Sequence, residues 1–147
     1  MTENKAGLPP EPLAGEIVAR GFRDWPTELL QEFRDNEFNG NVGGRLLDES
    51  PWARVWDIRL APGERLPAHR HVLDYSWTAL TAGHSRQHTH DGTTREVTYQ
   101  AGESRSFTFG EGEYLLHDLE NIGDTTLAFV TVELLGDRAL QVRRDDR

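Results

Sequence analysis

Two histidines one residue apart, His69 and His71, have a type and spacing that could do chemistry. They lie in the stretch PGERLPAHRHVLDYSW, after a proline-glycine pair and before an apolar, aromatic run. On an extended strand alternate side chains share a face, so the two imidazoles should lie side by side while Arg70 points the other way. Two neutral imidazoles can share a metal ion, and a third ligand from elsewhere would complete the site. The pair therefore predicts part of a metal site.

The segments that must position this pair have the alternating pattern of β-strands. Residues 54–60, RVWDIRL, place Trp56, Ile58 and Leu60 on one face, as in a half-buried antiparallel strand. Residues 76–83, 106–110 and 127–135 have the composition of further strands, and residues 86–99 indicate a hairpin with a type I′ turn at Asp91 and Gly92. Many short strands separated by turns predict an all-β sandwich or barrel.

One short helix is predicted before the strands. In DWPTELLQEF, Leu29, Leu30 and Phe33 fall on one side at helical spacing, and Pro26 suits a first helical turn. A helix this short is marginal alone and must dock on something. We expect it to pack, with the proline-rich N-terminal segment, across the interface of a homodimer, which would also protect sheet edges.

The chain is expected to divide into a flexible N-terminal tail, an arm with the short helix, one barrel and a C-terminal tail, at residues 1–15, 16–40, 41–136 and 137–147. At 147 residues it has the usual size of one domain. The net charge of −9 repels nucleic-acid phosphates, so we expect no nucleic-acid partner. No apolar run is long enough to cross a bilayer and the start lacks the pattern of a signal peptide, so no membrane association and a cytoplasmic location are expected.

Residues 62–83 resemble the first sequence motif of the cupin superfamily, through Gly63, the pair His69 and His71, and Gly83, with Ser76 where the motif has a glutamate. A second motif is matched by Gly102, Glu103, His117 and Asn121. The resemblance covers about residues 41–136 and implies a single cupin jelly-roll barrel. It also implies that His117 is the third metal ligand, facing His69 and His71 from another strand across the barrel.

More narrowly, the segments around these motifs resemble a small group of single-domain cupins known as beta-alanine degradation proteins, a name that states no reaction. With no cysteine in the chain, a metal ion must be held by histidine, carboxylate or water. Three histidines would hold a divalent ion, which we leave open among iron, zinc, nickel and manganese.

Three residues after the histidine pair are alternative candidates for a position beside the ion. Asp74 could be a carboxylate ligand, although its strand parity is opposite to that of His69 and His71. Tyr75 could point inward and donate to a bound substrate, which makes it the candidate catalytic residue. Each could equally be a strand residue with an ordinary hydrogen bond, and Ser76 could face the ion at the glutamate position.

The other histidines are expected to lie on the surface. His88 and His90 form a second alternate pair, but they adjoin the Asp91-Gly92 turn, where a hairpin tip is normally in solvent. His84 follows a turn glycine and is interpreted in the same way. The alternating aromatic residues are expected to pack in the core, and these are Trp56, Trp77, Phe107, Phe109 and Phe129.

The sequence therefore indicates a metal-binding barrel for a small molecule. An ion held by three neutral histidines keeps its positive charge, which favours a small organic acid and Lewis-acid or oxygen-activating chemistry. The alternative is a non-catalytic cupin module that binds or senses a small metabolite. The fold cannot choose between them, because one architecture hosts many functions.

Overall fold

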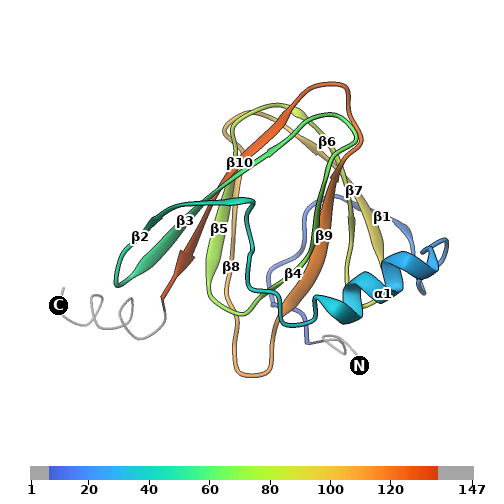
Figure 1. Cartoon of the computed structure of the whole chain (residues 1–147), viewed down its shortest axis with the longest axis horizontal. Coiled ribbons are helices and arrows are strands. Elements are labelled where there is room, and N and C mark those ends of the chain that lie inside the picture. Colours follow the sequence, from blue (N-terminus) through green and yellow to red (C-terminus); the bar gives the residue numbers. More distant parts are fainter. Residues whose placement is uncertain (1–6, 136–147) are drawn as a thin grey trace.

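The chain forms two antiparallel sheets of five strands within residues 7–135, the part that the computed structural model describes. Sheet A has the order β1 (Glu16–Ala19), β7 (Thr94–Tyr99), β6 (Gly83–His88), β9 (Leu115–Asn121) and β4 (Arg65–His71). Sheet B has the order β2 (Arg45–Glu49), β3 (Ala53–Leu60), β10 (Leu127–Leu134), β5 (Tyr75–Ala79) and β8 (Ser104–Phe107). The expected all-β barrel is confirmed (Figure 1).

The core lies between the two sheets. Alternation along β3 and β10 turns Ile58, Leu60, Leu127 and Phe129 inward, where each is less than a tenth exposed, and Leu119 of β9 joins them from sheet A. Burial of these side chains is the main force that holds the sheets together. Of the aromatic residues expected in the core, Trp56, Phe107 and Phe129 are buried, whereas Trp77 and Phe109 are half-buried.

Helix α1 (Thr27–Asp35) packs on the outer face of sheet A, beside β4 and β9 (Figure 1). Its apolar side, Leu29 and Phe33, is buried against Ala68 and Leu116 with Trp25. The helix therefore finds its apolar partners in its own chain, and its burial does not require the second subunit that the sequence suggested. Within residues 7–135 no helix is long and apolar enough to cross a membrane.

The described part of the N-terminal tail, residues 7–15, lies against the barrel. Both carboxylate oxygens of Glu11 accept hydrogen bonds from Thr108, one from its backbone N–H at 2.9 Å and one from its hydroxyl at 2.6 Å. The N–H of Tyr114 donates to the carbonyl of Gly7 at 2.8 Å, and Ala14 is buried in the core. The sequence predicts flexibility here because prolines and small residues offer little to bury, whereas the observed contacts are mainly polar. The C-terminal tail, 137–147, lies outside the described residues.

The hairpin of β6 and β7 is present, but its turn differs from the expected one. A type I′ turn needs positive φ at both central residues. Gly92 has φ +89°, whereas Asp91 is not among the residues with positive φ. The carboxylate of Asp91 instead accepts hydrogen bonds from the N–H and the hydroxyl of Thr93. The turn is thus stabilised by an aspartate side chain, and only glycine takes the left-handed conformation.

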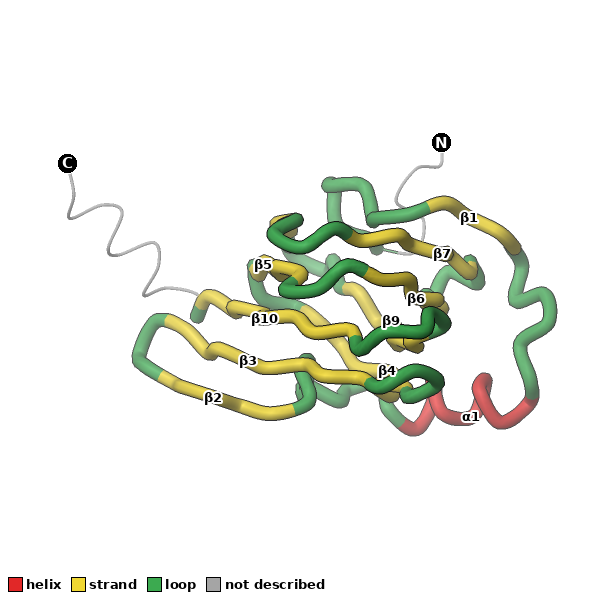
Figure 2. Tube along the Cα trace, turned by 90° about the horizontal axis from the view of Figure 1, so that it is seen from above, coloured by secondary structure: helices red, strands yellow, loops and turns green. Residues whose placement is uncertain are grey.

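The hairpin of β2 and β3 extends sheet B away from α1 (Figures 1 and 2). β2 forms the edge of sheet B, and all five of its residues are exposed. Large apolar side chains on and near this hairpin are also exposed, namely Leu46, Leu47, Trp52 and Leu134. The arrangement leaves an apolar sheet edge at the end of the molecule opposite the helix.

Candidate metal centre

The structure brings His69, His71 and His117 together, as the sequence predicts. Strands β4 and β9 are neighbours, and His69 lies directly opposite His117 in their register. His71 lies two residues further along β4 and therefore on the same face. The ligand nitrogens of the three side chains all lie within 4.8 Å of one another. The expectation that His117 faces the pair across the barrel is wrong, because adjacent strands of one sheet supply all three ligands.

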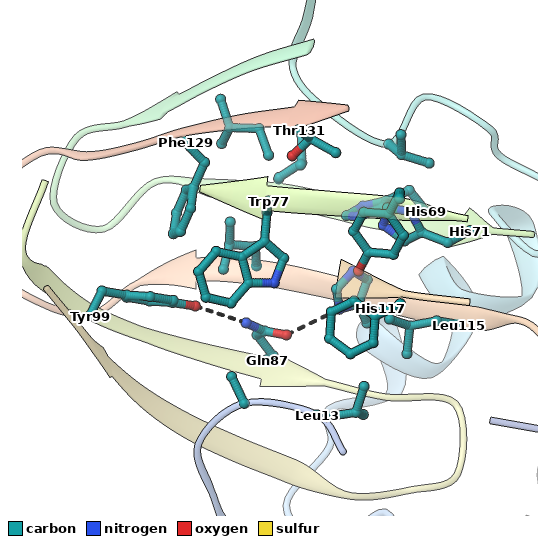
Figure 3. A pocket seen from close by; sticks show the side chains of 17 residues that line it. Leu13, His69, His71, Trp77, Gln87, Tyr99, Leu115, His117, Phe129 and Thr131 are labelled. Carbon is teal, nitrogen blue, oxygen red and sulfur yellow. Dashed lines mark hydrogen bonds between the residues drawn. The ribbon is translucent and has the colours of Figure 1, made fainter. Parts of the chain in front are cut away.

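Hydrogen bonds fix two of the three imidazole rings. The Nδ1–H of His69 donates to the carbonyl of Pro67 at 2.8 Å, and the Nδ1–H of His117 donates to Oε1 of Gln87 at 3.1 Å (Figure 3). A neutral imidazole that donates from Nδ1 has its lone pair on Nε2. Both rings thus have the tautomer and the outer hydrogen bond that metal-binding histidines commonly show.

His71 lacks such a hydrogen bond. Its ring stacks on Tyr75, with the ring centroids 3.8 Å apart and the planes 10° apart. Its Nδ1 is buried and finds no hydrogen-bond partner among the described residues. A buried polar atom without a partner is costly, and a bound ion or water often satisfies such an atom. The unpartnered nitrogen on His71, together with the Nε2 lone pairs of His69 and His117, fits a bound divalent cation.

Burial keeps these histidines neutral. It lowers the pKa of His69, which is 2% exposed, and lowers the pKa values of His71 and His117 further below the usual value. The mutual proximity of the rings adds to the effect, since two imidazolium charges would repel. Neutral imidazole is the form that binds a metal ion, so the three side chains already have the protonation state that metal binding requires.

The cluster opens into a cavity of about 50 Å³ between the two sheets (Figure 3). None of the described residues that line the cavity is charged. Polar atoms come from Gln87, Tyr99, Tyr75 and Thr131. The remaining wall is apolar, and its residues are Leu13, Ala14, Val42, Ile58, Leu66, Trp77, Phe107, Leu115, Leu119 and Phe129. A bound ion would be the one strong charge inside an otherwise uncharged cavity.

Asp74, Tyr75 and Ser76, the alternative candidates for a position beside the ion, differ in their positions relative to the cavity. Tyr75 lines the cavity, as does Trp77, two residues along β5. Ser76 lies between them, so its side chain projects from the other face, and it is not a cavity residue. The carboxylate of Asp74 accepts a hydrogen bond from the N–H of Phe109 at 2.9 Å and does not belong to the histidine cluster. Of the three residues between which the sequence leaves the choice open, only Tyr75 lines the cavity.

The expectation for His88 is wrong in part. Its side chain is only 13% exposed, and its Nδ1 lies 2.9 Å from the fully buried carboxylate of Asp118 on the outer face of sheet A. Arg65 donates to the same carboxylate at 2.7 Å. His90 is half-buried and stacks on Tyr114. Neither histidine joins the cluster, because the outward-facing side of β6 and the following loop carry them away from the cavity.

The remaining residues noted in the sequence are structural. His84 is exposed, as expected, and its ring bonds to Thr98. The buried side-chain amide of Asn121 donates to the carbonyls of Leu60 and Thr125, and so ties the turn after β9 to the end of β3. The carboxylate of Glu103 accepts a hydrogen bond from the N–H of Gln100 in the turn that precedes β8.

Sequence reasoning missed Gln87 and Leu13. Gln87 directly precedes His88, and the alternation of β6 turns Gln87 inward with Ser85. That parity was a usable signal. Leu13 comes from the proline-rich segment, whose composition contains no sign that it reaches the cavity.

No protein-family model and no curated protein matches the chain. Solved structures do match. A cupin domain from Bordetella pertussis Tohama I has a TM-score of 0.55 at 24% identity, over 67% of this chain and 97% of that one. An RmlC-like cupin family protein from Methanocaldococcus jannaschii has a TM-score of 0.51 at 18% identity, over 66% and 83% of the two chains.

A third match spans nearly the whole chain. A conserved protein with a double-stranded β-helix domain, from Klebsiella pneumoniae subsp. pneumoniae MGH 78578, has a TM-score of 0.50 at 18% identity, over 93% of this chain and 90% of that one. At these identities the similarity shows the fold. The chain has the double-stranded β-helix of cupin proteins, which supports the resemblance that its two histidine-containing motifs suggested.

Proposed function

We propose that this cupin barrel binds a divalent metal ion through His69, His71 and His117 and acts on a small organic acid. The observation that carries the proposal is the cluster of three imidazoles, with His69 and His71 buried and His117 half-buried, in which Nδ1 of His71 has no partner among the described residues. Removing one imidazole would leave a poor pair of ligands, so all three are needed. Iron, zinc, nickel and manganese all accept such ligands.

The bound ion would supply Lewis-acid activation of a substrate oxygen or, with iron, of dioxygen. The residues of the cavity wall determine which ligands can bind beside the ion. Because the described lining residues carry no charge, nothing in the wall offsets the ion's two positive charges or repels an anion. A carboxylate head group is therefore favoured beside the histidines, with an apolar body against the aliphatic and aromatic wall.

Tyr75 is the residue that we assign to substrate. It lines the cavity and stacks on His71, so its ring holds that ligand in place while its side chain borders the ligand space. Burial raises the pKa of the Tyr75 phenol above its usual value, so the hydroxyl stays protonated and can donate to a substrate oxygen. Thr131, on the adjacent strand β10 of the same sheet, offers a second neutral hydroxyl.

The resemblance to beta-alanine degradation proteins adds a practical choice of compounds. The deaminated relatives of beta-alanine are small acids whose only charge is a carboxylate, which fits the charge argument, whereas the ammonium group of beta-alanine itself finds no carboxylate in the described wall. Short amino-acid-derived acids are therefore the first substrates to test.

A non-catalytic binding module is the second candidate. The observation that favours it is the lack of any carboxylate, lysine or arginine among the described residues of the cavity wall, which leaves few groups for general acid-base catalysis. Such a module would bind the same acids without converting them.

One experiment distinguishes an enzyme from a non-catalytic binding module. Protein loaded with iron, zinc, nickel or manganese is incubated with a panel of small organic acids in air, and substrate and product are followed by mass spectrometry. An enzyme gives metal-dependent product, and Tyr75→Phe lowers the rate about 100-fold at unchanged metal content, because it keeps the ring and loses the donor. Tight binding without product identifies the module, and absence of both binding and product refutes the proposal.

A further inference from the structure

We infer that Leu13 sets the size limit of the ligand, and that the cavity accepts short-chain monocarboxylates while excluding longer ones. This inference rests on the proposed function, since it concerns the acid that binds beside the histidines. Leu13 belongs to the N-terminal segment of residues 7–15, which precedes β1 and is separate in sequence from every metal ligand.

The size of the cavity limits its ligand. Its volume is about 50 Å³, room for about four water molecules. That space suits a ligand of about four or five non-hydrogen atoms, the size of acetate or propionate. A longer acid that keeps its carboxylate beside the histidines must push its chain against the wall.

Most of that wall belongs to paired strands, whereas Leu13, Ala14 and Val42 come from segments outside any strand. The residues from β3, β5, β9 and β10 are held by sheet pairing on both sides of their strands. Leu13 and Ala14 precede β1, outside any strand, and Leu13 is half-buried. Figure 3 shows Leu13 on the opposite side of the pocket from Phe129 and Thr131. Leu13 thus borders the cavity on a side opposite the inward face of β10.

The position of Leu13 is fixed from both ends of its segment. On the N-terminal side, Glu11 accepts two hydrogen bonds from Thr108, which follows β8. On the C-terminal side, Gly15 approaches β7 so closely that an added Cβ would lie 2.5 Å from the carbonyl oxygen of Glu96. Its φ of +87° also favours glycine. Between these two attachments Leu13 is held against the cavity, although it makes no contact that the histidine cluster needs.

The test measures carboxylate affinity against chain length by calorimetry at fixed ionic strength. Zinc-loaded wild type and Leu13→Ala are titrated with formate, acetate, propionate, butyrate and hexanoate. We expect wild-type affinity to fall about tenfold or more from propionate to hexanoate, and Leu13→Ala to abolish that fall. Acetate affinity and zinc content should be unchanged, which also shows that the variant is folded.

Two further variants sharpen the result. Leu47→Ala removes an exposed leucine on β2, far from the cavity, and should keep the wild-type profile. Thr108→Val removes the hydroxyl that Glu11 accepts from, so the segment loosens and longer acids should bind better than in wild type.

The outcomes show separately whether the inference about Leu13 fails and whether the proposed function fails. If zinc-loaded protein binds carboxylates with the same length profile in wild type, Leu13→Ala and Thr108→Val, then Leu13 does not limit size and the inference is wrong while the function stands. If no carboxylate binds at any length although zinc is bound, both are wrong.

Discussion

Nδ1 of His117 lies 3.1 Å from Oε1 of Gln87, and the other end of the same amide lies 3.0 Å from the hydroxyl of Tyr99. That hydroxyl is in turn 2.9 Å from the Oγ of Ser85. The amide of Gln87 is therefore oriented from both ends, and its oxygen faces the imidazole. His117 of β9, a candidate metal ligand, is thus held by a chain of hydrogen bonds that runs through β6 and β7.

Gln87→Leu should weaken metal binding about 10- to 100-fold, because His117 loses the acceptor that fixes its tautomer and its ring. Gln87→Glu keeps an acceptor at that position and should restore most of the affinity. A competition titration against a chromophoric chelator measures both. Equal affinity in Gln87→Leu and wild type would show that this hydrogen bond does not orient His117.

His88→Ala should leave metal content unchanged and lower stability. The variant removes one partner of the buried carboxylate of Asp118, which keeps Arg65 and the backbone N–H of residue 88. We expect a loss of about 1–3 kcal/mol in the free energy of unfolding, measured by urea denaturation. Reduced metal occupancy in this variant would mean that the outer face of sheet A influences the site.

The metal-free protein should lose stability below about pH 6.5. Burial lowers the pKa values of His69, His71 and His117 below that usual value. At a pH between the usual pKa and the lowered pKa, these histidines are protonated in the unfolded chain but neutral in the folded chain. Stability contributed by the neutral rings is complete above pH 6.5 and falls as the pH drops toward the lowered pKa values, by up to about 1.4 kcal/mol per pH unit for each histidine.

Denaturation of chelator-treated protein between pH 7.5 and 5 measures this slope. His71→Phe keeps a ring beside Tyr75 and should reduce the slope, whereas the exposed His84→Ala should not. A slope that is the same in wild type and His71→Phe would contradict the assignment of His71 as a buried neutral group.

Strand parity explains what the sequence could predict of this site. The pair His69 and His71 was placed on one face from spacing alone, and the resemblance to cupins supplied His117. The resemblance places Ser76 at the glutamate position and leaves open which of Asp74, Tyr75 and Ser76 faces the ion. The structure decides for Tyr75, because Tyr75 and Ser76 alternate across β5 and only Tyr75 lines the cavity.

Tertiary contacts account for what the sequence could not predict. The approach of Leu13 to the cavity depends on a pairing between Glu11 and Thr108 that are 97 residues apart. The burial of His88 depends on Asp118, 30 residues away on another strand. Neither contact leaves a local pattern, so periodicity and composition predicted a flexible tail and a solvated hairpin tip.

The homodimer stays a prediction. The structure favours an interface at β2 over the interface at the N-terminal segment and helix that the sequence suggests. Helix α1 is buried within its own chain, whereas β2 presents an exposed edge with Leu46 and Leu47. Exposed edges are usually covered, so we expect a homodimer in which a second copy pairs along β2. Light scattering should give a dimer for wild type and a monomer for Leu47→Asp, at equal metal content. A wild-type monomer would exclude this interface.

The most direct test of the central claim is metal content after incubation with iron, zinc, nickel or manganese and removal of unbound ions. Elemental analysis of untagged wild type should give close to one divalent ion per chain with at least one of these metals. His117→Ala should lose most of it, because a pair of imidazoles is a poor chelate. His84→Ala, whose ring lies outside the cluster, should keep the wild-type content. If wild type binds none of the four metals in stoichiometric amount, or if His117→Ala binds as much as wild type, then His69, His71 and His117 do not form a metal centre.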